Sequence, residues 1–117
     1  MNTEKLTELV TGALEGLKAI NIVCLDVHDI SNVTDCMVIA SGTSRRHVNS
    51  LAENVVATAK KQGVMPLGTE GEAEGEWILV DLGDVLVNVM MPDTRLLYDL
   101  EKLWAPVPAD KSQDEKG

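Results

Sequence analysis

The chain has 117 residues, of which 44% are hydrophobic and 25% are charged, and these values are ordinary for a single soluble globular domain. Its formal net charge of −9 argues against direct binding to DNA or RNA, because neutralising a phosphate backbone requires clustered lysines and arginines. The same charge suits a basic protein partner, although many proteins are acidic only because charge keeps them soluble.

The cysteines and the hydropathy pattern indicate a cytoplasmic protein. Cys24 and Cys36 each fall in a predicted strand, with no spacing typical of a metal site or a redox pair. We expect two buried free thiols, which behave as small hydrophobic side chains. No apolar run approaches the ~20 residues of a membrane span, and the N-terminus lacks a secretory signal pattern. The sequence therefore predicts no membrane contact, no metal and no cofactor.

The first half of the chain predicts one helix and two strands. Apolar residues at helical spacing indicate a helix over residues 3–18, capped by Asn2 or Thr3. Residues 21–27 and 36–40 are apolar on both alternating sets, which is typical of strands in the interior of a sheet. A polar connection joins these two strands.

A long helix follows the second strand. The stretch Ser41 to Ser44 opens it, and its apolar stripe extends from Val48 to Ala59. Lys60 and Lys61 in its last turn complement the helix dipole, and Gly63 is a natural stop.

The last third of the chain carries shorter elements. Residues 64–67 form a candidate edge strand, which Pro66 weakens, and residues 70–76 form a glycine-rich acidic loop. A proline is placed to start a final helix over residues 92–103. The composition of residues 105–117 predicts a flexible polar and acidic tail.

Residues 76–91 predict a hairpin whose two faces differ chemically. Gly83 and Asp84 suit a two-residue turn, which places Leu82 opposite Val85 and fixes the register of both strands. One side is a core face that holds Ile78, Val80, Leu82, Val85, Val87 and Val89. The other, the mixed face, holds Trp77, Leu79, Asp81, Leu86, Asn88 and Met90. A face that is half apolar and half polar is suited to being covered by another molecule.

This order of elements predicts an α/β or α+β fold, in which a mixed β-sheet packs against flanking helices. No internal repeat is visible, and we expect residues 1–104 to form one domain.

The stretch Ser41 to Ser44 precedes a helix N-terminus, where backbone N–H groups can hold an anion. It lacks the lysine of a P-loop and the three glycines of a dinucleotide fingerprint. Helix capping by Thr43 or Ser44 is therefore the favoured interpretation. Arg45 and Arg46 then lie where the helix dipole disfavours cations, which a functional contact or simple solvent exposure would explain.

The sequence offers no positive case for an enzyme. A small nucleotidyltransferase would use Asp81 or Asp26 with a divalent metal and the Ser41-Gly42 loop, and only fragments of such a site are present. No Ser–His–Asp arrangement can be defended. His28 and His47 lie in or near polar segments and are expected to be solvated.

Residue types that anchor protein interfaces gather near the end of the chain. Trp77 begins the mixed face, while Arg95, Tyr98 and Lys102 fall along one side of the predicted final helix. Trp, Tyr and Arg are the residues that most often dominate binding energy. Trp104 is better explained as closing an edge of the core, whereas alternation points Trp77 away from the core face.

Several separated motifs resemble the ribosomal silencing factor family, also called the Iojap family. They are TDCMVIASGTSRRHV at residues 34–48, Glu70-Gly71, residues 76–90 and YDLEKLW at residues 98–104. The resemblance runs in order from about Leu6 to Trp104. The chain departs from the family at Cys36 and Met37, where many members carry aromatic residues, and at Asn88, where a histidine is frequent.

The resemblance implies a bacterial factor that binds the large ribosomal subunit through its basic L-fourteen-type protein. Such factors obstruct joining of the small subunit and so dampen translation when nutrients are scarce. The family fold is similar to nucleotidyltransferases but lacks their catalytic set, and members are often homodimers.

We therefore predict a translational repressor that is not an enzyme. The expected partner-binding residues are Trp77, Leu79, Asp81, Leu86 and Met90, bordered by Arg95, Tyr98 and Lys102, with Glu70 and Glu72 steering toward a basic partner. Two alternatives remain open: the nucleotidyltransferase-like enzyme, and a homodimeric scaffold that buries the mixed face against its own copy.

Overall fold

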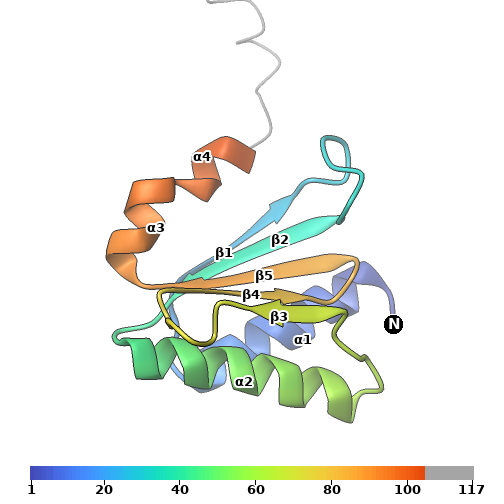
Figure 1. Cartoon of the computed structure of the whole chain (residues 1–117). Helices are drawn as coiled ribbons and strands as arrows, with labels where there is room; N and C mark the ends of the chain where they lie inside the picture. The colour runs from blue at the N-terminus through green and yellow to red at the C-terminus, as the bar shows by residue number, and fades with distance from the viewer. Residues whose placement is uncertain (105–117) are drawn as a thin grey trace, which may run out of the picture.

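A mixed five-stranded sheet with helices on both sides forms the described part of the protein, residues 1–104 of a computed structural model (Figure 1). The helices are α1 (Thr3–Gly16), α2 (Arg45–Lys61), α3 (Pro92–Tyr98) and α4 (Leu100–Trp104). The strands are β1 (Ile20–Asp26), β2 (Cys36–Ser41), β3 (Gly68–Glu70), β4 (Trp77–Asp81) and β5 (Val85–Met90). The predicted tail over residues 105–117 lies outside the described residues.

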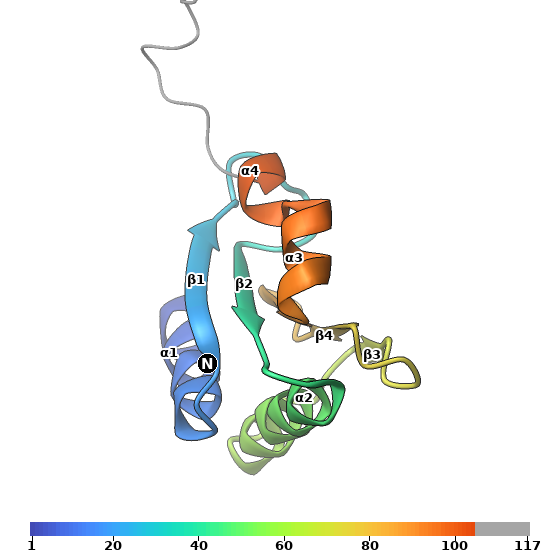
Figure 2. The same ribbon diagram turned by 90° about the vertical axis from the view of Figure 1, so that its left-hand side faces the viewer.

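The strand order is β1-β2-β5-β4-β3. Strands β2 and β5 run parallel, and all other neighbours in the sheet are antiparallel. Helices α1 and α2 pack beneath the sheet, whereas α3 and α4 rise from its other side (Figures 1 and 2). This arrangement confirms the predicted mixed sheet with flanking helices. Within residues 1–104, no helix is long and apolar enough to cross a membrane.

Both long helices begin at side-chain caps. The Asn2 carboxamide oxygen accepts the Lys5 backbone N–H at 2.8 Å, which identifies Asn2 as the cap of α1. The Ser44 hydroxyl accepts the His47 backbone N–H at 3.0 Å and so caps α2. Each cap satisfies a backbone donor that the first helical turn leaves without a partner. The predicted stop at Gly63 is also confirmed, since this residue has φ of +82°.

The main core lies between the sheet and the helices α1 and α2. The hairpin supplies the predicted core face, whose six side chains are between 0 and 6% exposed. Apolar stripes of α1 and α2 pack onto these side chains, with Leu14 and Leu51 fully buried. The helical and strand periodicities therefore meet in one aliphatic core, as the sequence predicts.

The prediction that residues 21–27 form an interior strand is wrong in one respect, because β1 is an edge strand. Its burial alternates, and Cys24 is exposed rather than buried. Cys36 lies in β2, which has a neighbour on each side; it is buried as expected, and burial raises the pKa of its thiol. Apolar composition alone did not reveal that β1 has a neighbour on one side only.

Two further boundaries differ from expectation. The short strand after α2 covers Gly68–Glu70 instead of residues 64–67, which agrees with the poor fit of Pro66 to a strand. The predicted final helix is divided into α3 and α4 at Asp99, whose backbone is left-handed with φ of 49° and ψ of 54°. Aspartate tolerates this conformation better than most residues, and the break turns α4 back over the sheet.

Candidate docking surface

The hairpin that carries the mixed face has the predicted register. Leu79 lies opposite Asn88 and Asp81 opposite Leu86, and the turn closes with a hydrogen bond of 3.0 Å from Leu82 N–H to the Val85 carbonyl. Gly83 has φ of +88°, as a first central turn position requires. The Asp81 carboxylate accepts the Gly83 backbone N–H at 2.9 Å. Asp81 therefore helps to fix the turn as well as contributing charge to the mixed face.

Trp77 is half-buried and is held from two sides. Its indole Nε1–H donates to the Asn88 carboxamide oxygen at 2.9 Å. Its ring lies 5.0 Å from the ring of Tyr98, centroid to centroid, at an interplanar angle of 47°. Tilted aromatic pairs at this separation are favourable beyond the area that they bury. The structure thus brings together two predicted interface residues that are separated by a strand and a helix.

Asn88 is a residue that the sequence-based site omitted. Its side chain is 2% exposed, and its amide nitrogen is the one buried side-chain N or O atom without a hydrogen-bond partner in the described chain. Ile39 and Leu79 lie opposite Asn88 on the neighbouring strands, so its flanks are apolar. Leaving such a donor unpaired costs about 1–3 kcal/mol.

The expectation that Met90 belongs to an open surface is wrong. Its side chain is 0% exposed and packs in a second core cluster with Met37, Ile39 and Leu100. Because the chain turns at Asp99, α4 covers this end of the mixed face. Trp104 packs against the same cluster, which confirms its predicted role in closing the core.

Arg95 is also buried rather than part of an exposed border, with 8% of its surface exposed. Its guanidinium donates to both carboxylate oxygens of Glu101, at 2.9 and 3.1 Å, and to the Ser41 hydroxyl at 3.0 Å. A longer bond of 3.4 Å reaches the Ile20 carbonyl. The Arg95 side chain lowers the pKa of the Glu101 carboxyl by hydrogen bonding. Arg95 therefore ties α3 and α4 to the sheet.

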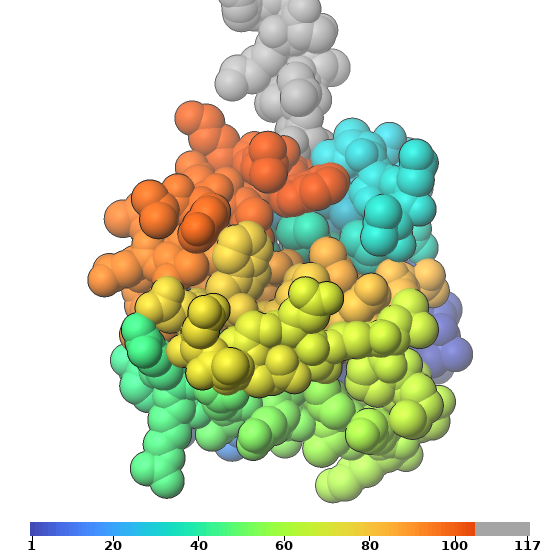
Figure 3. All heavy atoms as spheres, viewed as in Figure 1, coloured from blue at the N-terminus to red at the C-terminus, as the bar shows by residue number. Residues whose placement is uncertain are grey.

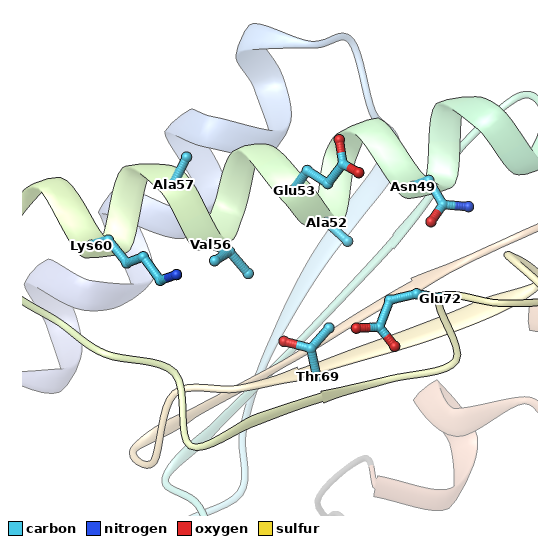
Figure 4. A pocket seen from close by; sticks show the side chains of 8 residues that line it. All are labelled: Asn49, Ala52, Glu53, Val56, Ala57, Lys60, Thr69 and Glu72. Atoms are coloured by element: carbon cyan, nitrogen blue, oxygen red, sulfur yellow. The ribbon is translucent and has the colours of Figure 1, made fainter.

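The two steering glutamates lie on different sides of β3. Glu70 is exposed and lies opposite Leu79, so its side chain shares the side of the sheet that carries the mixed face. Glu72 instead lines a hollow of about 380 Å³ between α2 and β3. Figure 4 shows Thr69 pointing across this hollow toward α2, with the Glu72 carboxylate bent toward Thr69. Only Glu70 is thus adjacent to Trp77 and its neighbours.

Helices α3 and α4 carry an exposed apolar ridge that the sequence-based site missed in part. The ridge consists of Leu96, Leu97, Tyr98 and Leu103, which are 81, 76, 55 and 69% exposed. These helices stand above β3 and the loop that follows it (Figure 3). A signal was present in the sequence, because three consecutive apolar residues on a helix span too wide an arc to be buried together. Lys102 is exposed on α4, beside the ridge.

The parts of a metal-dependent transferase site are not brought together. Asp26 lies opposite Cys36 on the side covered by α1, whereas Asp81 lies opposite Leu86 on the mixed face. Ser41 is paired with Met90, four positions along β5 from Leu86 and therefore roughly 13 Å away. Within residues 1–104, no group of three or more His, Cys, Asp or Glu side chains is arranged to hold a metal ion.

The loop before α2 is occupied by the protein's own side chains. His47 Nδ1 accepts the Thr43 backbone N–H at 2.9 Å, and its Nε2 lies 2.7 Å from the Leu17 carbonyl. His47 therefore bridges two loops, in contrast to the solvated side chain that we expected. Gly42 packs against Val48 so closely that an added Cβ atom would come within 2.9 Å of it. This geometry favours the capping interpretation of the loop.

Two further groups of charged side chains form pairs at the surface. Arg45 contacts Glu76 across the start of α2, and both side chains are largely exposed. His28 bonds to the Asp26 carboxylate at 2.7 Å through Nδ1 and lies 3.0 Å from Asp29 through Nε2. Hydrogen bonding to Asp26 is the main cause that raises the pKa of His28.

Comparison with known proteins identifies the family to which this chain belongs. Residues 1–117 match the sequence model of a family described as "Ribosomal silencing factor during starvation". The chain belongs to this ribosomal silencing factor family. It is 45% identical over 100 residues to the ribosomal silencing factor RsfS of Haemophilus influenzae, covering 86% of this chain and 98% of that protein. The family resemblance predicted from the sequence motifs is thereby confirmed, and membership indicates a ribosome-associated role in silencing.

Other relatives of this ribosomal silencing factor support the same assignment. A crystal structure of a Chromobacterium violaceum protein superposes with a TM-score of 0.88 at 40% identity, covering 93% of this chain and 92% of that one. A mouse protein named "Mitochondrial assembly of ribosomal large subunit protein 1" is 32% identical over 100 residues, which are 83% of this chain and 44% of that protein. The mixed sheet and its flanking helices are therefore the fold of the family.

Proposed function

We propose that this ribosomal silencing factor binds the large ribosomal subunit through its basic L-fourteen-type protein and thereby prevents the small subunit from joining. The observation that carries the proposal is the half-apolar surface on which Trp77 is held against Tyr98. Leu79 and Leu86 on the same face remain only half-buried. Aromatic anchors beside partly exposed leucines are the composition of a protein-docking surface.

The charge of the surface supports a basic protein partner over ribosomal RNA. Glu70 and Asp81 border the leucines of the mixed face, while Arg95 is turned inward to Glu101 and offers no charge to a phosphate. The whole chain carries a net charge of −9, which repels a nucleic-acid backbone at long range.

The mechanism is steric and requires no chemical step. When the protein occupies a surface of the large subunit that the small subunit needs, the concentration of complete ribosomes falls in proportion to the fraction of large subunits occupied. A micromolar complex corresponds to about −8 kcal/mol of binding free energy, which a few desolvated anchors can supply. Such a factor would act in the cytoplasm, with no cofactor and no catalytic residue.

Sedimentation of purified components tests the proposal. The protein is mixed with bacterial large subunits and centrifuged through sucrose, and small subunits are then added at a magnesium concentration that supports joining. We expect the protein to sediment with large subunits and to reduce the peak of complete ribosomes in proportion to the amount bound. Normal joining at saturating protein would contradict the proposal.

The nucleotidyltransferase alternative is tested separately by calorimetry with nucleotide and magnesium. The separation of Asp26, Asp81 and Ser41 across two faces and two ends of the sheet argues that no such heat will be seen. Heat that disappears in an Asp81→Asn variant would revive the alternative.

A further inference from the structure

The amide nitrogen of Asn88 lies beneath the candidate docking surface without a partner. Its flanking neighbours across the sheet are Ile39 and Leu79, and its neighbours on the same side of β5 are Leu86 and Met90. None of the four side chains carries an oxygen or nitrogen, and the Met90 sulfur, which is only a weak acceptor, makes no hydrogen bond to the amide. A folded protein leaves few buried polar groups unpaired, and such a group calls for an explanation.

Exchanging the nitrogen and oxygen of the carboxamide does not remove the problem. The indole Nε1–H of Trp77 is a donor only, and it lies 2.9 Å from the Asn88 oxygen. With the carboxamide reversed, two donors would face each other and the oxygen would lose its partner. The unpaired atom is therefore the N–H₂ group, which needs an acceptor.

Apart from Asn88, the side chains of the mixed face offer acceptors but no free donor. Asp81 and Glu70 contribute carboxylates along its border, and the indole N–H of Trp77 is used by Asn88. Leu79 and Leu86, the side chains on either side of Asn88, are only half-buried and carry no hydrogen bonds that would oppose a rotamer change. A docking molecule can reach the amide by displacing one of these leucines.

We propose that the Asn88 amide donates a hydrogen bond to a backbone carbonyl oxygen of the protein that docks on the mixed face, and so determines which partners bind tightly. This inference rests on the proposed function. A basic protein partner has few carboxylates to present at a contact, whereas a backbone carbonyl is available on any exposed loop or strand edge. A partner without an acceptor at this point leaves the Asn88 donor buried and unpaired. Such a partner therefore binds more weakly than one that presents an acceptor.

Two substitutions test the donor, and the fluorescence of Trp77 reports whether the support that Asn88 gives to the indole is kept. Asn88→Leu removes both the acceptor used by Trp77 and the free donor. Asn88→His retains both, because a neutral imidazole accepts at one ring nitrogen and donates at the other. Trp104→Phe is added to every variant, including the reference protein, so that fluorescence reports on Trp77 alone.

The measurements are the affinity for purified bacterial large subunits, the thermal midpoint and the emission maximum of Trp77. We expect Asn88→Leu to lower the affinity at least tenfold while the emission maximum of Trp77 stays at its reference value. The thermal midpoint checks that the variant is folded, because this substitution removes one unpaired donor but leaves the Trp77 indole N–H without its acceptor. Asn88→His is expected to stay within about threefold of the reference affinity.

Each other result overturns the inference. Equal affinities of the Asn88→Leu variant and the reference protein would show that the donor is not used, while the proposed function would stand. A loss of affinity in either variant that is accompanied by a shift of Trp77 emission would show that Asn88 only supports the indole. If the reference protein fails to bind large subunits, the proposed function fails first and this inference falls with it.

Discussion

Trp77 combines a structural and a surface role in one side chain. Its indole pairs with Asn88 inside the fold, while its ring contacts Tyr98, which is 55% exposed. Residues of this kind are well suited to binding, because the ring is held in place before the partner arrives and loses little conformational freedom on contact. The polar atom of the indole is satisfied internally, so the ring can present its apolar surface outward.

We predict that Trp77→Ala weakens binding to the large subunit by ~2 kcal/mol or more, which is roughly a thirtyfold increase in the dissociation constant. The reason is the loss of an aromatic anchor that is already ordered. Competition sedimentation against labelled wild-type protein measures the effect. Val33→Ala is the matched control, because Val33 is 76% exposed in the loop between β1 and β2. Unchanged binding by Trp77→Ala, with a folded variant, would remove Trp77 from the docking surface.

His28 gives the fold a pH-dependent contribution at its surface. The Asp26 carboxylate, assisted by Asp29 and Asp35, raises the pKa of His28 above its usual 6.5. The folded protein therefore binds this proton more tightly than the unfolded chain. The resulting stabilisation is complete below pH 6.5 and is lost as the pH rises through the folded pKa. His28 in turn lowers the pKa of Asp26, so the effect of that pairing is lost in strong acid.

We predict that His28→Gln lowers the thermal midpoint at a pH of about 5.5 and has little effect at a pH of about 9. The expected difference is small, since both partners are exposed to solvent and screened by salt. Differential scanning calorimetry of both proteins across this range measures it. A gap between the two midpoints that is the same at both ends of the range would contradict the proton linkage.

At the scale of elements, the entry of the chain into β4 depends on one glycine. Gly71 has φ of +95°, and a Cβ atom built on it would clash with the Trp77 carbonyl oxygen. This close approach sets where β3 ends and where Trp77 begins the next strand. The position of the aromatic anchor is therefore linked to a residue without a side chain.

We predict that Gly71→Ala destabilises the protein by more than about 2 kcal/mol, because both the backbone conformation and the contact with Trp77 are incompatible with a side chain. Gly12→Ala is the control. Gly12 lies in α1 with open space around it, so alanine there should stabilise by about 0.5–1 kcal/mol. Urea denaturation measures both changes, and equal effects of the two substitutions would contradict the assignment.

The sequence predicted those elements whose signals are local. The hairpin register followed from Gly83 and from strict alternation, and α2 followed from its cap and its apolar stripe. What the sequence did not predict depends on contacts between distant segments. Met90 is covered because Asp99 adopts a left-handed conformation, and Arg95 is buried because Glu101 and Ser41 both accept from it. An apolar or basic residue beside a predicted helix does not reveal such long-range partners.

At the scale of the whole molecule, the two faces of the sheet have separate tasks. Helices α1 and α2 seal one face into an aliphatic core, and this core holds the other face rigid. Helices α3 and α4 cover only one end of that other face, through Leu100 and Trp104. The uncovered remainder, with the apolar ridge beside it, is a surface of fixed shape that can dock without refolding.

The charge of the whole molecule affects how fast it associates with a partner. Residues that act on the association rate can therefore be distinguished from residues that hold the complex together. Glu70 adjoins the mixed face, while Glu72 lies across β3 toward α2. Both are within reach of a basic partner at low salt, where the screening length is ~10 Å or more. We predict that the double variant Glu70→Gln with Glu72→Gln slows association with large subunits roughly three- to tenfold at low salt and leaves dissociation unchanged.

Stopped-flow measurement of association at increasing salt tests this prediction, and the rates of the variant and the wild-type protein should converge as salt is raised. The control is Glu4→Gln with Glu8→Gln, which removes the same charge from α1, a helix that packs on β1, β2 and β5 rather than on β3. If net charge alone governed the encounter, both double variants would slow association equally. A larger effect at Glu70 and Glu72 would instead locate the approach at the β3 edge of the sheet, next to the strand that carries Trp77.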